Sequence, residues 1–179
     1  DVLNVLAPRP SLKWPNDLMV GPRKLCGVLS RVVTGPRGEL FVVVGLGVNL
    51  NVCAATLPPQ AVSLSELLGE PVDREAVLES LLRGLFERVD AWRNAGPGPQ
   101  LAEWLERSAW LGRRVSVFSG PGDPAHAPAA GPLAPLEGRV LGLTVDGGLR
   151  LAPLGGGAEQ VVFAGDVSLK GMAVTERAE

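Results

Sequence analysis

The chain has 179 residues, of which 46% are hydrophobic and 20% charged, and its formal net charge at pH 7 is −2. This length suits one medium domain or two small ones with a real core. The sequence shows no basic patch, so its charge gives no argument for nucleic acid or an anionic membrane surface as partner. It also lacks an apolar run of about 18 residues and a signal-peptide pattern, so we expect no membrane span.

The sequence contains two cysteines, Cys26 and Cys53. They are too few for a disulfide framework and lack the spacing of metal ligands. We therefore expect reduced, buried thiols in a cytoplasmic protein, and no metal held by the chain.

The first fifty residues predict antiparallel strands. A short strand over Leu12–Trp14 ends at the turn residues 15–17. Strands over Val28–Val33 and Leu40–Val44 are separated by a short turn at 34–38, which favours a hairpin. The unbroken apolar, β-branched-rich run of the second strand is typical of a strand covered on both faces.

Helices are predicted next. Ser63 and Glu66 form a capping box for a short helix that stops at Gly69. Asp73 can cap a longer helix, which the breaker at 95–99 ends. The apolar residues of this helix share one face and are Val77, Leu78, Leu81, Leu82, Leu85, Phe86 and Val89. A third helix then brings together Leu101, Trp104 and Leu105.

After Arg113 the pattern becomes strand-like. Short strands are predicted at Val115–Phe118, Arg139–Leu143, Leu149–Leu151 and Gln160–Phe163, with a hairpin turn at 146–148. This series suggests a small barrel, so we place a domain boundary at Leu111–Gly112. The segment 119–135 is rich in Pro, Gly and Ala and predicts a long flexible loop. The only histidine, His126, lies in it, which argues against a role as general base.

Polar residues near the first strands are candidates for a ligand site. Lys24 follows the turn 21–23 at the start of the Val28–Val33 strand. Its ammonium can hold a phosphate or carboxylate, or can simply be solvated, as most lysines are. Asn16 and Asp17 suit a turn equally well, because both side chains bond their own backbone.

Gly45 and Gly47 end the predicted Leu40–Val44 strand region. Glycine at such a place allows close approach of a ligand to the backbone, or a bulge. Asn49 beside them suits either recognition of a purine edge or the capping of a turn.

Three motifs, in this order and spacing, resemble bacterial biotin protein ligases. They are Lys13-Trp14-Pro15-Asn16-Asp17-Leu18, Arg23-Lys24-Leu25-Cys26-Gly27-Val28-Leu29 and Gly45-Leu46-Gly47-Val48-Asn49. The resemblance is strongest over residues 12–51 and only architectural after residue 113. It implies an α+β fold, in which a mixed or antiparallel sheet with helices forms part of a class II synthetase-like catalytic domain. That domain would occupy residues 1–111, followed by a small SH3-like β-barrel over 112–179.

The resemblance also implies a two-step reaction in the cytoplasm. Biotin and ATP, with Mg²⁺, give biotinyl-5′-AMP and pyrophosphate, and the adenylate then acylates a lysine of a biotin carboxyl carrier protein of acetyl-CoA carboxylase or a related carboxylase. By the same resemblance, Lys24 would contact the biotin carboxylate and the adenylate phosphate and neutralise developing charge. Asp17 would orient the acceptor amine or a metal. The residues implied in substrate and nucleotide binding are Lys13, Trp14, Asn16, Lys24, Gly27, Gly45, Gly47 and Asn49.

The sequence departs from the family pattern in ways that matter for activity. The family's Gly/Arg-rich adenylate-binding loop and the upstream biotin-pocket residues do not precede Lys13, and the first residue is Asp1 rather than Met. We therefore expect the C-terminal part of a ligase that is weakly active or inactive alone, exposes apolar surface and aggregates easily. A homodimer is compatible with this reading. Cys26 stands where the family often has alanine and receives no catalytic role.

Two alternatives remain open. Lipoate ligases also place a lysine at an adenylate, although the Lys13–Asp17 motif favours biotin. A non-catalytic module that binds a carrier protein through its barrel is the second alternative.

Overall fold

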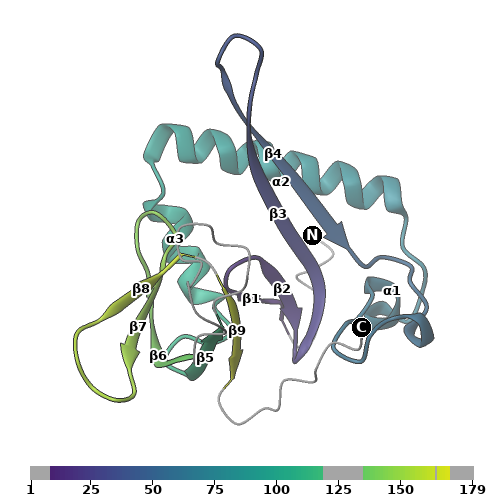
Figure 1. The fold of residues 1–179 in the computed structure, drawn as a ribbon. Coiled ribbons are helices and arrows are strands. Elements are labelled where there is room, and N and C mark those ends of the chain that lie inside the picture. Colours follow the sequence, from purple (N-terminus) through teal and green to yellow (C-terminus); the bar gives the residue numbers. More distant parts are fainter. Residues whose placement is uncertain (1–8, 119–134, 164, 170–179) are drawn as a thin grey trace. The chain divides into compact units, whose positions relative to one another are not determined.

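The computed structural model describes residues 9–118, 135–163 and 165–169 (Figure 1). The chain divides into two compact units, Asp1–Gly96 and Pro97–Glu179. Within the described residues no helix is long and apolar enough to cross a membrane. The predicted domain boundary at Leu111–Gly112 stays a prediction.

The first unit contains a four-stranded antiparallel sheet in chain order. Its strands are β1 (Ser11–Lys13), β2 (Asp17–Val20), β3 (Arg23–Thr34) and β4 (Leu40–Val48). The predicted hairpin is present as β3 and β4, which pair from Cys26↔Val48 to Thr34↔Leu40. β2 was not predicted, because its first residue belongs to what we interpreted as a turn. β3 also begins earlier than predicted, so Lys24 lies inside the strand.

The prediction that Leu40–Val44 is covered on both faces is wrong. The exposed fractions of these five side chains run from 43% at Val44 to 72% at Leu40, and Leu46 is 42% exposed. An unbroken apolar run indicates a covered strand only where a further layer packs on it. Within the part of the chain that the structure describes, no layer covers this ribbon, which Figure 1 shows as a long hairpin.

Two helices of this unit begin and end as the sequence predicts. The Ser63 hydroxyl accepts a hydrogen bond from the Glu66 amide at the start of α1 (Leu64–Leu68), which ends at Gly69 with φ of 79°. Asp73 caps α2 (Arg74–Ala95) by accepting bonds from two backbone amides. No residue of α2 is fully buried. Of its predicted apolar face, Val77 packs against the core of the unit, while Leu78 and Phe86 are 55% and 64% exposed. A short 3-10 turn, η2 (Ala54–Thr56), precedes them.

A small hydrophobic core holds the first unit together. Its buried members come from β2, β3, the segment entering α1 and the first residue of α1, and are Val20, Leu25, Val62 and Leu64. Leu25 is fully buried and stands between Lys24 and Cys26 in the chain. The core therefore fixes the stretch of β3 that carries the predicted site residues.

The second unit contains α3 (Gly98–Glu106) and a five-stranded antiparallel sheet of order β8-β7-β6-β5-β9. The strands are β5 (Arg114–Phe118), β6 (Leu136–Leu143), β7 (Leu149–Pro153), β8 (Gln160–Val162) and β9 (Asp166–Leu169). Four of them match predicted strands, and β9 was missed.

The second sheet does not form a closed barrel in the described residues, because β8 and β9 are its two edges. The predicted turn at 146–148 is present, with φ of 85° at Gly147. The predicted loop 119–135 lies outside the described residues except for Pro135, and His126 lies outside them as well.

Candidate functional site

The two lysines of the first unit meet at one carboxylate. The Lys24 Nζ lies 2.5 Å from Asp17 Oδ1, and the Lys13 Nζ lies 3.9 Å from Asp17 Oδ2. The Asp17 and Lys13 side chains are 14% and 17% exposed, while Lys24 is 44% exposed. We call these three side chains the charge cluster. Two ammonium groups and one carboxylate give it a net charge of about +1 at neutral pH, which suits a monoanionic group.

Strand register brings the charge cluster together. Lys13 pairs with Asp17, Asp17 pairs with Gly27, and Gly27 pairs with Gly47, so one row crosses all four strands. Directly paired residues project to the same face of a sheet. The two glycines in this row leave bare backbone beside the charge cluster.

Gly45 extends this bare surface along the sheet. It pairs with Leu29, two residues along β3 from Gly27. A Cβ at Gly45 or Gly47 would first meet a backbone carbonyl oxygen of β3, at the ordinary contact distance of 3.7 Å. We call Gly27, Gly45 and Gly47 the glycine floor. Of the two alternatives left open by the sequence, close approach of a ligand to the backbone stays a prediction at these positions.

An irregularity in β3 sets the position of Lys24. Met19 pairs with Lys24 and Leu18 pairs with Cys26, so Leu25 is an extra residue on β3. The Lys24 amide donates to the Gln60 carbonyl at 2.7 Å, and its carbonyl accepts from the Val62 amide at 3.0 Å. The backbone of Lys24 is thus bonded to the segment that enters α1. Its ammonium extends from a fixed point.

Asn49 and Asn16 also contact this region. The Asn49 Nδ2 donates to the carbonyls of Lys24 at 3.4 Å and Val62 at 3.2 Å. The Asn16 carbonyl accepts from the Val28 amide at 2.8 Å. Trp14 is only 5% exposed and belongs to the buried core rather than to an open surface. The structure therefore brings Asn49 to the backbone of Lys24, a contact that the sequence motif did not indicate.

The two cysteines differ in environment. Cys26 is 7% exposed and its thiol donates to the Gly27 carbonyl at 3.6 Å. Burial raises the pKa of the Cys26 thiol; the positive charge of Lys24 opposes this effect and the negative charge of Asp17 adds to it. Cys53 is exposed, so the prediction that both thiols are buried is wrong for Cys53. Its short stretch before η2 lies outside the core.

No family model matches the chain, but individual relatives do. The biotin–[acetyl-CoA-carboxylase] ligase of Mycobacterium tuberculosis is 40% identical over 107 residues, covering 59% of this chain and 38% of that protein. The same-named enzyme of Paracoccus denitrificans is 35% identical over 120 residues, covering 64% and 50%. Part of this chain is homologous to biotin protein ligases. The chain spans between about a third and a half of the length of the curated relatives it matches.

Solved structures of biotin protein ligases agree in fold. The apo biotin protein ligase of Aquifex aeolicus matches with a TM-score of 0.71 and 24% identity, over 93% of this chain and 68% of that chain. The same ligase in complex with biotin and ATP matches with a TM-score of 0.69. These similarities confirm a mixed α/β fold with antiparallel sheets.

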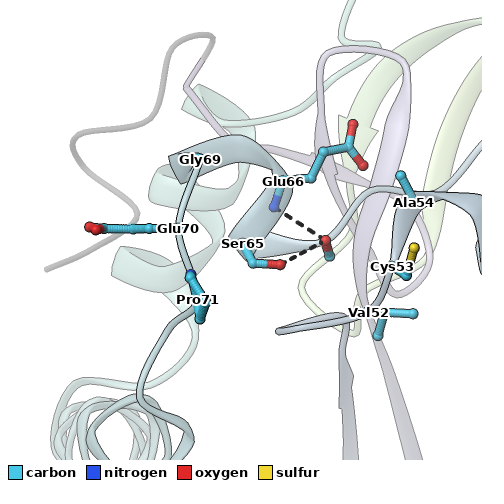
Figure 2. Close-up of a pocket in the computed structure, with 9 residues that line it drawn as sticks. Val52, Cys53, Ala54, Ser65, Glu66, Gly69, Glu70 and Pro71 are labelled. Atoms are coloured by element: carbon cyan, nitrogen blue, oxygen red, sulfur yellow. Dashed lines mark hydrogen bonds between the residues drawn. The ribbon is translucent and has the colours of Figure 1, made fainter.

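A pocket that the ligase motifs did not indicate lies beside α1 (Figure 2). It is lined by Val52, Cys53, Ala54, Ser63, Ser65, Glu66, Gly69, Glu70 and Pro71. None of the predicted site residues lines it. The Ser63 hydroxyl, which caps α1, lies 3.2 Å from the Ser65 Oγ. The capping box is the only sequence signal near this pocket, and it predicts a helix start rather than a site.

Proposed function

We propose that this chain is part of a biotin protein ligase that activates biotin with ATP to biotinyl-5′-AMP and transfers biotin to a lysine of a carboxyl carrier protein. The observation that carries the proposal is the charge cluster of Lys13, Asp17 and Lys24 beside the glycine floor. Homology to biotin ligases and the fold shared with a ligase that binds biotin and ATP support it.

The proposed chemistry follows from charge. Attack of the biotin carboxylate on the α-phosphorus of ATP forms the C–O–P bond and releases pyrophosphate, and negative charge builds up on the phosphoryl oxygens. A fixed ammonium such as Lys24 lowers the energy of that charge. Lys13 and Asn16 would lie near the phosphates and nucleotide, and Asn49 near the adenine. Asp17 would orient the acceptor amine, which attacks the acyl carbon and releases AMP.

Magnesium enters this proposal only as part of the ATP substrate. Among the described residues there is no group of three His, Cys, Asp or Glu side chains that could hold a metal ion. The Asp17 carboxylate already faces two ammonium groups. Mg²⁺ is commonly held by phosphates and waters with one or two carboxylates. We therefore assign no metal-binding residue in this chain.

The proposal extends to the whole protein. Residues 1–111 would belong to the catalytic domain and residues 112–179 to an SH3-like β-barrel, in a cytoplasmic enzyme that can form a homodimer. Because the chain spans half or less of its curated relatives, we propose that it supplies one wall of the site and is weakly active or inactive alone.

Calorimetric titration with biotinyl-5′-AMP tests the site. Lys24→Ala removes one charge-assisted contact and should weaken binding about 10- to 100-fold. Arg31→Ala is the matched control, because it removes a cation from the same strand outside the charge cluster. Equal affinities of Lys24→Ala and the unchanged chain would remove Lys24 from the site.

Two further measurements separate the alternatives. Titration with biotin and with lipoate separates the two substrates, and binding of lipoate alone would overturn the choice of biotin. In a biotin-dependent ATP–pyrophosphate exchange assay we expect little or no exchange from this chain. Robust exchange would contradict the proposal that it is inactive alone.

A further inference from the structure

We infer that Gly27 is a positioning residue: the absence of a side chain at this position allows the Lys24 ammonium to lie over β3 and meet Asp17. The importance of that ammonium for an anionic ligand rests on the proposed function. The steric argument rests only on the described structure of the first unit.

The evidence is the space that Lys24 occupies. A Cβ at position 27 would lie 2.9 Å from the Lys24 Nζ and 3.0 Å from its Cε, and 3.7 Å from Asp17 Oδ1. Real Cβ atoms essentially never approach another heavy atom within 3.0 Å. The end of the Lys24 side chain therefore occupies the volume that any other residue at position 27 would need.

The clash is specific to Gly27 within the glycine floor. Its direct partner Gly47 would place a Cβ no closer than 3.7 Å to its nearest neighbour, the Gly27 carbonyl oxygen. Neither glycine has a positive φ, so alanine fits the backbone at both positions. Any difference in the position of the Lys24 side chain between Gly27→Ala and Gly47→Ala is therefore due to contact with that side chain and not to backbone strain.

The response to an added Cβ follows from exposure. The Lys24 side chain is 44% exposed and flexible, so it can move outward. The Asp17 side chain is 14% exposed and cannot follow it readily. Gly27→Ala should therefore separate the 2.5 Å pair between Lys24 and Asp17 and leave the sheet intact. Position 27 thus controls where the positive charge stands relative to the glycine floor.

Amine acylation measures this placement directly. The chain has three lysines, so mass spectrometry after treatment with the N-hydroxysuccinimide ester of acetic acid can follow each one. In Gly27→Ala, Lys24 leaves its carboxylate partner, and its acylation relative to Lys13 should rise about two- to fivefold, as the loss of one partly exposed ion pair implies. Gly47→Ala should leave this ratio unchanged. An unchanged ratio in Gly27→Ala would overturn the inference.

A second variant covers the case in which Gly27→Ala does not fold. Asp17→Asn removes the partner without adding an atom at position 27. Because Lys13 also lies 3.9 Å from Asp17, the acylation rate of Lys24 in this variant is compared with its rate in the unchanged chain, and it should rise by a similar factor. In the double variant, Gly27→Ala should add nothing further, because both changes break one contact. Additive effects, or an unchanged acylation rate of Lys24 in Asp17→Asn, would refute the positioning role.

The proposed function fails separately from this inference. If the chain does not bind biotinyl-5′-AMP, the ligase proposal falls while the acylation result stands. If biotinyl-5′-AMP binds but Gly27→Ala leaves the ratio unchanged, the ligase proposal stands and Gly27 has no positioning role.

Discussion

Leu25→Ala tests whether the small core fixes the part of β3 that carries Lys24. The Leu25 side chain is fully buried, in a cluster with Val20, Val62 and Leu64. Leu25→Ala removes three buried carbons, which loses about 2.4 kcal/mol of transfer free energy at about 0.8 kcal/mol per buried CH₂ group. The cavity adds to this loss, and such changes cost about 2–5 kcal/mol in well-packed cores. We expect the free energy of unfolding to fall by about 3 kcal/mol.

Urea denaturation followed by far-UV circular dichroism is the measurement. With a slope of about 1–3 kcal/mol per molar urea, the midpoint of the first unit should fall by about 1–3 M. Leu29→Ala is the matched control, because Leu29 lies on the same strand and is 72% exposed. Its unfolding free energy should change by less than about 0.5 kcal/mol. Equal shifts for the two variants would refute the assignment of this core.

Two other predictions concern cysteine reactivity and the open hairpin. Because burial raises the pKa of the Cys26 thiol, less thiolate exists at a given pH, so Cys26 should react with Ellman's reagent more slowly than the exposed Cys53 at pH 8 and accelerate at higher pH. Cys53→Ser should abolish the fast phase, and a surviving fast phase would contradict the burial of Cys26. Phe41→Lys with Val43→Lys should lower concentration-dependent light scattering, because both side chains are more than half exposed on β4. Unchanged scattering would show that this ribbon does not drive self-association.

Features with local signals could be predicted from the sequence. The β3–β4 hairpin follows from two apolar runs joined by a turn that is too short for the crossover connection of a parallel pair. The starts of α1 and α2 follow from Ser63 and Asp73, whose side chains bond backbone amides within three residues. In each case the residues that determine the structure are neighbours in the chain.

Features that depend on distant residues could not be predicted. The sequence of Leu40–Val44 indicates a covered strand, but its exposure depends on which layers pack on it. The charge cluster depends on the register of three strands. The sequence motifs placed Lys13, Asp17 and Lys24 in one site only because those motifs resemble the ones of biotin protein ligases. The contact between a Cβ at position 27 and Lys24 depends on a side-chain conformation, which no spacing encodes.

β3 passes from a packed region into an open one along its twelve residues. Leu25 at one end is fully buried, while Leu29 and Val32 are 72% and 62% exposed. Backbone pairing with β4 continues from Cys26 to Thr34, but pairing without packing gives a local free energy of opening well below that of the whole unit. Amide hydrogen exchange should therefore divide this strand into a slow half and a fast half. Lys24 lies in the slow half, so the outer hairpin can fluctuate without moving the charge cluster.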